Sequence, residues 1–386
     1  MAVRVAVGIP SLCESDSIAH VVAQADRGLS RLFDPDSCMI VNVDSASPDG
    51  TAEVFRRTPT SCRKESLVLE DEPRGKGRNV WRFFDYCVEN DVEFLATLDA
   101  DVASITPGWI DALFAPLCAG QADFVAPLYS RSRFDAVTTN FFAYPLFYGL
   151  FGVDVRQPIG GEFALSRAFV SYLRRQASNP ATFGYGIDIF MSMHAVGGAF
   201  ELAQVELGKK IDKPSWPKRE RIFPDVAAAA LLVARQYGIV RTPDDPVERM
   251  PVSALDDSEG YAHRQDAQRL LDTSLRRIRR RELAWLDDAR LIDELESPEL
   301  RAATEAWSEI LAAWIRYTLG PCPDLPQSVL AAELETLVVV RAVLFWERNM
   351  ERPSTELAAE LTAQARLVRG NLLKRPAPAF RVPARS

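Results

Sequence analysis

The sequence EFLATLDAD, from Glu93 to Asp101, joins an apolar run to two carboxylates. Glu93 to Leu98 predicts a short buried strand. Asp99 and Asp101 flank a small alanine, and the period of two along an extended chain would place both carboxylates on one side. Two like charges there need a cation, and Mg²⁺ or Mn²⁺ takes one or two carboxylates together with diphosphate oxygens. The alternative is an acidic turn whose carboxylates accept hydrogen bonds from backbone N–H groups.

Strand and helix patterns alternate before this run. The expected strands are Val3–Ile9, closed by Pro10, Met39–Val43 and Ser66–Leu69; the expected helices are Ser15–Leu29, the segment through Phe55 and Gly77–Glu89. This alternation predicts an α/β fold with a mainly parallel sheet. The carboxyl ends of parallel strands form a ligand-binding edge, so the polar residues that follow the strands are expected to form one site. These residues are Ser11, Glu14, Asp44, Asp99 and Asp101. That placement favours a metal-diphosphate platform over an acidic turn.

The composition shifts along the chain and predicts separate parts. We expect an α/β domain over residues 1–244, a helical domain over 245–373 and a basic, proline-containing tail over 374–386. In the first domain, Gln157–Phe163 and Phe183–Phe190 are typical of loops that enter helices, and Phe141–Gly152 of a buried or pocket-lining helix. Amphipathic runs predict the helices of the second domain, which are Ala262–Leu286, Glu299–Leu319, Leu330–Met350 and Ser354–Leu373.

The overall composition excludes several classes of protein. The chain has 386 residues, 47% hydrophobic and 25% charged, which indicates a folded protein of roughly two to three domains. With 45 Lys+Arg against 53 Asp+Glu, its net charge of −8 argues against a nucleic-acid partner. Six scattered cysteines and only three histidines form no zinc-type pattern. Reduced thiols, no signal-peptide pattern and no apolar run of about 20 residues predict a cytoplasmic protein without an integral membrane contact.

A second motif, Gly75–Lys76–Gly77, precedes an expected helix. The glycines would let the backbone approach a ligand, and Lys76 would offer a point charge to a phosphate or nucleotide. The spacing of a Walker loop is absent, and a plain flexible turn is the alternative.

Four motifs occur in one order along the chain: Ile9–Pro10–Ser11 with Glu14, Val43–Asp44–Ser45, Gly75–Lys76–Gly77 and Asp99–Ala100–Asp101. In this order they resemble the nucleotide-sugar-dependent glycosyltransferases of GT-A fold. Gln157–Glu162 and Tyr185–Asp188 are similar, more narrowly, to the retaining subgroup that contains mannosylglycerate synthase, glucosylglycerate synthase and glucosyl-3-phosphoglycerate synthase. The resemblance covers about Val3 to Leu207, and it implies a donor half over about 1–121 and an acceptor half over about 122–244.

The resemblance also implies roles for single residues. Residues expected to bind the nucleotide sugar donor are Pro10, Ser11, Glu14, Asp44, Lys76, Asp99, Ala100, Asp101, Ile159 and Gly160. Residues expected to bind the acceptor are Arg131, Thr139, Gly161 and Glu162. The expected metal ligands are Asp99, Asp101 and Asp212. Lys76 and Asp188 are the expected catalytic residues, because Lys76 would neutralise the leaving diphosphate and Asp188 would orient hydroxyls of the donor sugar.

The stretch from Ser130 to Thr139 resembles the glycerate-binding stretch of mannosylglycerate synthase. Arg131 and Thr139 would then bind a carboxylate and hydroxyls, which suits the chemistry of guanidinium and hydroxyl groups. The alternative is that Arg131 and Arg133 are surface charges near Asp135. The phosphoglycerate enzymes place an arginine where this chain has Val137, which disfavours a phosphorylated acceptor.

Two positions depart from the family pattern. Asp212 stands where members of the subgroup have a metal-binding histidine after a Leu–Gly pair. Aspartate is a hard ligand, so the metal preference would shift toward Mg²⁺ or Mn²⁺, or the site would be weaker. Cys13 stands where many GT-A enzymes have asparagine, which bears on base recognition.

The expected function is a metal-dependent retaining glycosyltransferase that moves glucose or mannose from a GDP- or UDP-hexose to D-glycerate or a similar small hydroxy acid. Retention is expected by same-face attack. One alternative is a glucosyl-3-phosphoglycerate synthase, and another is transfer to a polyprenyl phosphate, suggested by the apolar Phe141–Gly152 segment and the basic tail. A third is a non-catalytic nucleotide-sugar-binding protein. The amphipathic helices would permit a homodimer.

Overall fold

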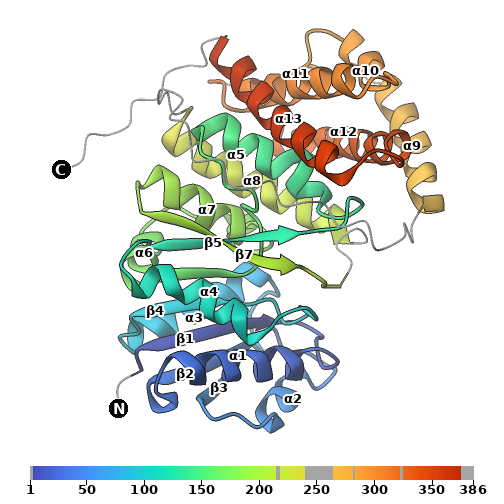
Figure 1. Cartoon of the computed structure of the whole chain (residues 1–386). Helices are drawn as coiled ribbons and strands as arrows, with labels where there is room; N and C mark the ends of the chain where they lie inside the picture. Colours follow the sequence, from blue (N-terminus) through green and yellow to red (C-terminus); the bar gives the residue numbers. More distant parts are fainter. Residues whose placement is uncertain (1–2, 214–217, 240–263, 281–282, 322–324, 375–386) are drawn as a thin grey trace. The chain divides into compact units, whose positions relative to one another are not determined.

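The computed structural model describes residues 3–213, 218–239, 264–280, 283–321 and 325–374. In these residues seven strands form one sheet in the order β3-β2-β1-β4-β6-β5-β7 (Figure 1). The strands are β1 (Val5–Ser11), β2 (Cys38–Asp44), β3 (Arg63–Val68), β4 (Phe94–Thr97), β5 (Phe124–Ser130), β6 (Phe163–Ser166) and β7 (Leu202–Lys209). β1 pairs in parallel with β2 and β4, and β2 with β3, whereas β6 is antiparallel to β4 and β5. The expected mainly parallel α/β sheet is therefore confirmed.

Two strand ends differ from the expectation. β1 continues through Pro10 to Ser11 instead of ending before the proline. The N–H of Leu98 donates to Gly8, so Gly8 and Pro10 present their backbone groups on the β4 side, where pairing ends at Thr97. The missing N–H of Pro10 therefore interrupts no ladder. β4 also ends at Thr97, so Asp99–Asp101 follow the strand in a turn and the period of two does not govern them.

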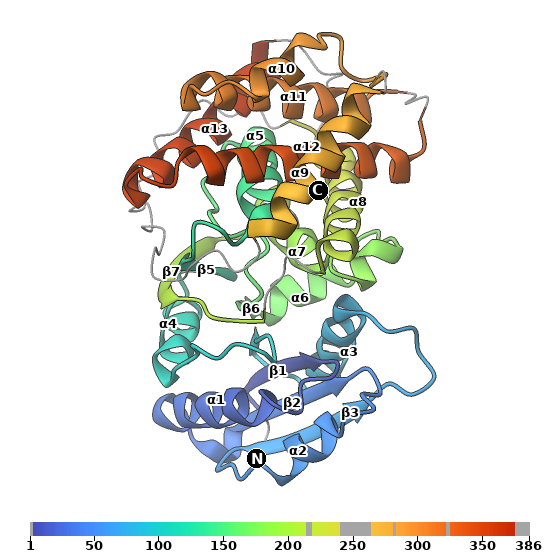
Figure 2. The same cartoon turned by 90° about the vertical axis from the view of Figure 1, so that its right-hand side faces the viewer.

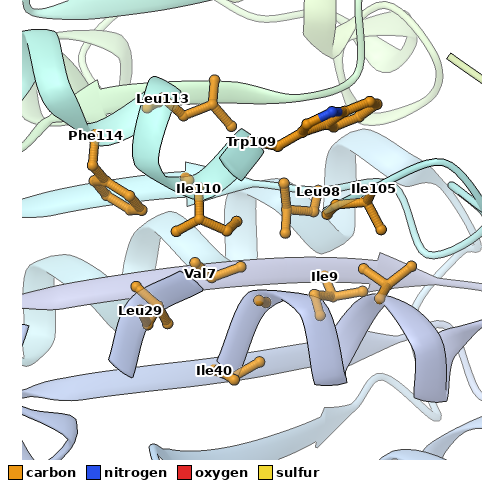
Figure 3. Packing of buried hydrophobic residues seen from close by; sticks show 14 of the residues in the cluster. Val7, Ile9, Leu29, Ile40, Leu98, Ile105, Trp109, Ile110, Leu113 and Phe114 are labelled. Atoms are coloured by element: carbon orange, nitrogen blue, oxygen red, sulfur yellow. The ribbon is translucent and has the colours of Figure 1, made fainter. Parts of the chain in front are cut away.

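Helices cover both faces of the sheet. They are α1 (Ile18–Leu32), α2 (Thr51–Arg57), α3 (Lys76–Glu89), α4 (Pro107–Cys118), α6 (Arg167–Leu173) and α7 (Ile187–Gly197), with a 3-10 turn at Pro180–Phe183. α1 and α4 share one apolar core with β1, β2 and β4 (Figure 3). In that core a Cβ on Gly28 of α1 would lie 2.5 Å from Ile110 of α4, so the glycine sets how closely these helices pack. α3 lies on the other face, where Phe83 covers Gly8, and α6 and α7 pack against α3.

A second compact unit is helical. Its elements are a π-helix (Thr139–Ala143), α5 (Tyr144–Phe151), α8 (Arg219–Tyr237), α9 (Arg264–Arg279), α10 (Arg290–Leu295), α11 (Leu300–Thr318), α12 (Gln327–Arg348) and α13 (Ser354–Lys374). α13 packs against α5 and α11, and α12 packs against α8, α9 and α11 (Figure 2). Trp307 donates to the carbonyl of Phe141 at 3.1 Å, and Gln364 donates to that of Asn140 at 3.0 Å. The buried helix predicted at Phe141–Gly152 and the helical C-terminal region are confirmed.

The two compact units do not follow the division expected at residue 244. One unit holds the described residues up to Tyr129 and from Ile159 to 213, and the other holds 130–158 with the described residues after 217. The segment 130–158 joins the helical unit because the apolar α5 packs on α13, which the order of residues along the chain does not disclose.

Two segments that were expected to enter helices lead into different elements. Gln157–Phe163 leads into β6 and not into a helix, which corrects the expectation. Phe183–Phe190 does lead into α7, as predicted. The tail beyond residue 374 lies outside the described residues. Within the part of the chain that the structure describes, no helix has the length and apolar character needed to cross a membrane.

Candidate functional site

A buried polar network joins the ends of β1 and β2. Ser11 Oγ donates to Asp44 Oδ2 at 2.7 Å, and Asn42 Nδ2 donates to Ser11 Oγ at 2.8 Å. Asp44 Oδ1 accepts from the backbone N of Ser47 at 2.7 Å, and Asn79 of α3 donates to the carbonyl of Ser11 at 3.2 Å. Ser11 and Asp44 are thus buried and hold the loop that follows β2. Their contact with a nucleotide stays a prediction.

Glu14 lies on the turn between β1 and α1. Its backbone N–H donates to Thr51 Oγ1 at 2.9 Å, and its Oε2 lies 2.7 Å from Lys213 Nζ. Lys213 also lies 2.7 Å from Asp16 Oδ1. Cys13, just before Glu14, has a φ of 60°, which non-glycine residues adopt only at special turns. Glu14 therefore has a cationic partner from the segment after β7, and its role toward the base stays a prediction.

The Gly75–Gly77 motif opens α3, and its glycines have a packing role that the sequence did not indicate. A Cβ on Gly77 would lie 2.0 Å from the carbonyl oxygen of Thr182, and one on Gly75 would lie 2.2 Å from that of Phe183. The N–H of Gly77 also donates to a carbonyl of this same turn, at 2.8 Å. The glycines let α3 approach the turn before α7, and an approach of their backbone to a ligand stays a prediction.

This close approach places Lys76 between two carboxylates. Lys76 Nζ lies 2.8 Å from Asp99 Oδ1 and 3.0 Å from Asp188 Oδ2. Burial would lower the pKa of Lys76, but Asp188 and Asp99 outweigh burial and raise that pKa above the ordinary lysine value. Lys76 is therefore a fixed cation at the strand ends, and the structure brings together three residues that the sequence had placed in one site.

Asp188 lies in the first turn of α7, where a carboxylate is favoured by the helix dipole. Its Oδ2 faces Lys76, whereas its Oδ1 is buried and has no hydrogen-bond partner among the described residues. Burial, opposed in part by Lys76, raises the pKa of Asp188. Buried acceptors are nearly always satisfied in native proteins, so this oxygen is suited to accept a hydrogen bond from a ligand hydroxyl.

Asp99 is held from both sides. Its Oδ2 lies 3.4 Å from Lys210 Nζ, opposite the Lys76 contact at Oδ1. A Cβ on Gly161, whose φ is +93°, would lie 2.1 Å from Asp99 Oδ2, so only glycine leaves room for this carboxylate. Burial would raise the pKa of Asp99, but the charges of Lys76 and Lys210 outweigh burial and hold that pKa well below the usual range of an aspartate.

Glu162 and the residues that precede it lie beside Asp99. Glu162 is fully buried, accepts from the hydroxyl of Tyr129, and lies 2.8 Å from Lys210 Nζ. Burial and the charge of Asp99 raise the pKa of Glu162 to about 7, although Lys210 opposes the shift. The carbonyl of Gly160 accepts from Lys210 at 2.8 Å, and Ile159 beside it is half-buried. Contacts of these residues with a donor or an acceptor stay predictions.

Asp101 differs from Asp99 in having no direct cationic contact among the described residues. No hydrogen bond or ion pair joins its carboxylate to any residue that the structure describes, and Ala100 before it is buried in the core. Burial and the nearby carboxylates of Asp99, Glu14 and Asp212 raise the pKa of Asp101 to about 6, although the charge of Lys210 opposes the shift. An uncompensated carboxylate among like charges is where a divalent cation gains most.

These residues fit one mode of metal binding and not another. Among the described residues, no group of three His, Cys, Asp or Glu side chains is arranged to hold a metal ion by itself. Asp212 Oδ2 lies 3.5 Å from Lys210 Nζ. Hard carboxylate donors with Asp101 uncompensated suit Mg²⁺ or Mn²⁺ that also takes oxygens from a diphosphate. The set Asp99, Asp101 and Asp212 stays a prediction.

Arg131 and Thr139, the other predicted acceptor residues, belong to the helical unit. Both are buried, and Arg131 lies 2.9 Å from Asp135 in an ion pair. Arg133 is buried as well and donates to the carbonyls of Asn349 and Met350. The interpretation of these arginines as surface charges is therefore wrong, and Arg133 serves to join the 130–158 segment to the end of α12.

The sequence reasoning missed several residues of the site. They are Lys210, Tyr129, Asn42, Asn79 and Lys213. Lys210 and Lys213 follow the strand β7, so the rule that ligands meet at strand ends could have included them. Tyr129 and Asn79 lie within a strand and a helix, and no local pattern marks their partners.

Comparison with known proteins gives a family for part of the chain. Residues 7–151 match the family described as Glycosyl transferase family 2. The search of curated proteins found no match. Among solved structures, the chain is similar to glucosyl-3-phosphoglycerate synthase from Mycobacterium tuberculosis. Its complex with phosphoglyceric acid is 25% identical, with a TM-score of 0.48 over 62% of this chain and 81% of that chain. Its complex with Mg²⁺ and uridine diphosphate is 24% identical, with the same TM-score of 0.48 and the same coverage, 62% and 81%.

Proposed function

We propose that this chain, a glycosyltransferase by its family 2 domain over residues 7–151, transfers glucose or mannose with retention from a nucleoside diphosphate sugar to D-glycerate or a similar small hydroxy acid. The observation that carries the proposal is the Lys76–Asp188 pair, in which the second carboxylate oxygen of Asp188 is buried without a partner. A sugar hydroxyl would satisfy that oxygen, and Lys76 supplies positive charge where a diphosphate leaves.

Each residue of the site has its own role in the proposed reaction. Mg²⁺ or Mn²⁺, held through Asp101 with Asp99 and Asp212 nearby, would neutralise negative charge on the leaving diphosphate. Lys76 supports the same charge from a fixed position, because its ion pairs with Asp99 and Asp188 hold it there. Asp188 orients the donor sugar through Oδ1. No carboxylate is cast as a nucleophile, and same-face attack remains the proposed route to retention.

The acceptor is proposed on narrower grounds. Arg131 and Thr139 match the glycerate-binding stretch of the subgroup, and Gly161 with Glu162 are proposed to complete the acceptor contacts. A buried arginine held in place by Asp135 is suited to a carboxylate, because its guanidinium is already oriented. The proposed donor is a GDP- or UDP-hexose, and the cytoplasm stays the proposed compartment.

A donor-by-acceptor transfer screen tests this function. GDP- and UDP-linked glucose and mannose are each paired with D-glycerate, 3-phosphoglycerate and a polyprenyl phosphate in the presence of Mg²⁺ or Mn²⁺, and released nucleoside diphosphate is measured. We expect release with D-glycerate and one donor, and the anomeric configuration of the product is read by NMR.

The other outcomes assign the alternatives. Release only with 3-phosphoglycerate identifies a glucosyl-3-phosphoglycerate synthase type of activity and moves the acceptor arginine elsewhere. Release only with the lipid phosphate, lost on adding detergent, identifies the polyprenyl route. Donor binding without release from any pair contradicts the enzyme assignment and identifies a nucleotide-sugar-binding protein.

A further inference from the structure

Lys210, which follows β7 directly, is the most enclosed cation of the sheet edge. Its side chain is 2% exposed, and Nζ lies 2.8 Å from Glu162 Oε2 and 2.8 Å from the carbonyl of Gly160. The ring of Tyr129 lies beneath Nζ, with its centroid 5.3 Å away. A buried ammonium group with this set of partners is fixed in one position, because each alternative rotamer would leave a charge or a carbonyl unsatisfied.

The same ammonium group reaches the two carboxylates that the site offers to a cation. Nζ lies 3.4 Å from Asp99 Oδ2 and 3.5 Å from Asp212 Oδ2. Because Lys76 lies at Oδ1 of Asp99, both oxygens of that carboxylate already face a lysine. Asp101, two residues further on, is paired with no described residue. Asp99 and Asp212 therefore lie against lysines, whereas Asp101 is in direct contact with no described lysine and feels the charge of Lys210 only from a distance.

We propose that Lys210 is a positioning residue that acts as a fixed internal cation: it holds Asp99, Gly160 and Glu162 in one arrangement and keeps Asp99 from serving as a metal ligand in the donor-free protein. This inference rests on the proposed function, since it concerns the metal that would assist the leaving diphosphate. The free protein then binds a divalent cation weakly through Asp101, and the oxygens of the diphosphate complete the metal site.

Direct Mn²⁺ binding by the donor-free protein, followed by electron paramagnetic resonance of free Mn²⁺, tests the proposal. Lys210→Met removes the charge and keeps a similar length, so Asp99 becomes available, and we expect the affinity for Mn²⁺ to rise at least about tenfold. Adding Asp99→Asn to this variant should abolish the gain. Lys210→Arg keeps the charge and should keep the weak affinity of the unchanged protein.

Controls separate a specific effect from a loss of structure. Lys209→Met alters the neighbouring lysine and should leave Mn²⁺ affinity unchanged. If Lys210→Met fails to fold because Glu162 is left buried without a cation, Lys210→Met with Glu162→Gln removes the stranded charge and should show the same gain. Circular dichroism and thermal unfolding report whether each variant is folded.

Three outcomes would overturn the proposal. The first is an unchanged Mn²⁺ affinity in folded Lys210→Met, and the second is a gain in affinity that survives Asp99→Asn. The third is that neither Lys210→Met nor Lys210→Met with Glu162→Gln folds, which would make Lys210 a purely structural residue. Because no donor is present in the measurement, a protein that transfers no hexose at all still gives a decisive result. Failure of the proposed function and failure of this inference are thereby distinguished.

Discussion

The position of the Asp99 carboxylate depends most directly on Gly161. Its φ of +93° and the 2.1 Å that would separate an added Cβ from Asp99 Oδ2 leave no room for a side chain. We expect Gly161→Ala to lower the free energy of unfolding by about 2–4 kcal/mol, from the strained φ and the contact together. Transfer should fall as well, because Asp99 must move. Urea denaturation and a transfer assay measure the two effects.

Gly120→Ala is the matched control. Gly120 has a φ of +67°, but no atom lies within 4 Å of an added Cβ. It should cost about 1 kcal/mol from φ strain alone and leave transfer intact. Equal effects of the two substitutions would show that contact with Asp99 is unimportant.

His194 gives a pH dependence of stability that is separate from the site. It is buried in α7 beside Phe190, with ring centroids 4.4 Å apart, and burial lowers its pKa to about 3. The unfolded chain takes up this proton near pH 6.5, whereas the folded chain does not, so stability present above about pH 6.5 is lost as pH falls toward about 3. Between pH 7 and pH 5 this residue should remove about 2 kcal/mol.

His194→Gln should therefore flatten the decline of unfolding free energy between pH 7 and pH 5, as measured by urea denaturation at each pH. His20→Gln, at an exposed histidine of α1, should leave the decline as it is in the unchanged chain. The assignment fails if both variants keep the same slope.

We expect transfer to depend strongly on Asp101, although this residue is partly exposed. Asp101→Asn removes the uncompensated charge that would hold the metal and should lower kcat at least about 100-fold. Asp71→Asn, on an exposed loop, should change kcat little. Near-normal turnover of the Asp101 variant would contradict the metal assignment.

Residue patterns predicted part of this site, for physical reasons. Lys76 stands out because it lies between two glycines, and Asp99 because it follows an apolar strand. Asp188 was predicted only from the family resemblance, and the structure joins all three residues. Glu162 was predicted only from the family resemblance, and Lys210 was missed although it follows β7. Their ion pair depends on the order of the strands in the sheet, which sequence patterns do not show.

Elements place the site residues more than their own sequences do. The start of α3 is set by its contact with the turn at Thr182, which brings Lys76 to Asp188. Gly77→Ala would push α3 away from that turn, since its Cβ would lie 2.0 Å from a carbonyl oxygen. We expect a lower midpoint of thermal unfolding, by several degrees, and reduced transfer through loss of the Lys76–Asp188 pair.

The control for this element is Gly108→Ala in the first turn of α4. An added Cβ there meets only Thr106 Oγ1, at an ordinary 3.5 Å. Because alanine favours helix over glycine, the midpoint should stay or rise slightly. A similar loss in both variants would mean that close packing at α3 is not what the glycine provides.

The elements up to β4 and the long C-terminal helices were predicted from the sequence, whereas α4, β5 and β7 were not, and the ends of elements were less predictable. Hydrophobic periodicity located α1, α3 and α11 to α13, although α12 is buried on all sides from Thr336 to Trp346 and not on one face. It placed the end of β1 before Pro10, because the sequence does not show that β4 stops short beside it. The loop at Gln157–Phe163 leads to a strand because β4 and β5 both offer it an edge.

At the scale of the whole molecule, the glycosyltransferase resemblance is confirmed by the family match over residues 7–151, but the expected domain boundary does not coincide with the compact units. Segment 130–158 depends on helices far along the chain: Gly149 of α5 lies against Val368 of α13, and Trp307 donates to Phe141. Sequence patterns do not reveal contacts between segments that lie so far apart in the chain.

A chain cut after residue 244 should therefore fail to fold α5. Without α11 and α13, the apolar side chains of α5 lose their cover, and we expect dye binding to exposed hydrophobic surface, aggregation and protease cleavage within 130–158. The full chain serves as the control. A monomeric fragment with cooperative unfolding and no dye binding would contradict this dependence.

The sheet order also constrains the sequence of events as the protein is made. β6 lies between β4 and β5, yet β5 is synthesised before β6. Until Phe163–Ser166 has left the ribosome, β5 lacks the strand β6 with which it pairs. Its apolar residues Phe124 and Val125 then have no partner residues on β6. The four parallel strands β1 to β4 are all made before β6, whereas the part of the site that holds Glu162 and Lys210 needs β6 and β7 to be complete.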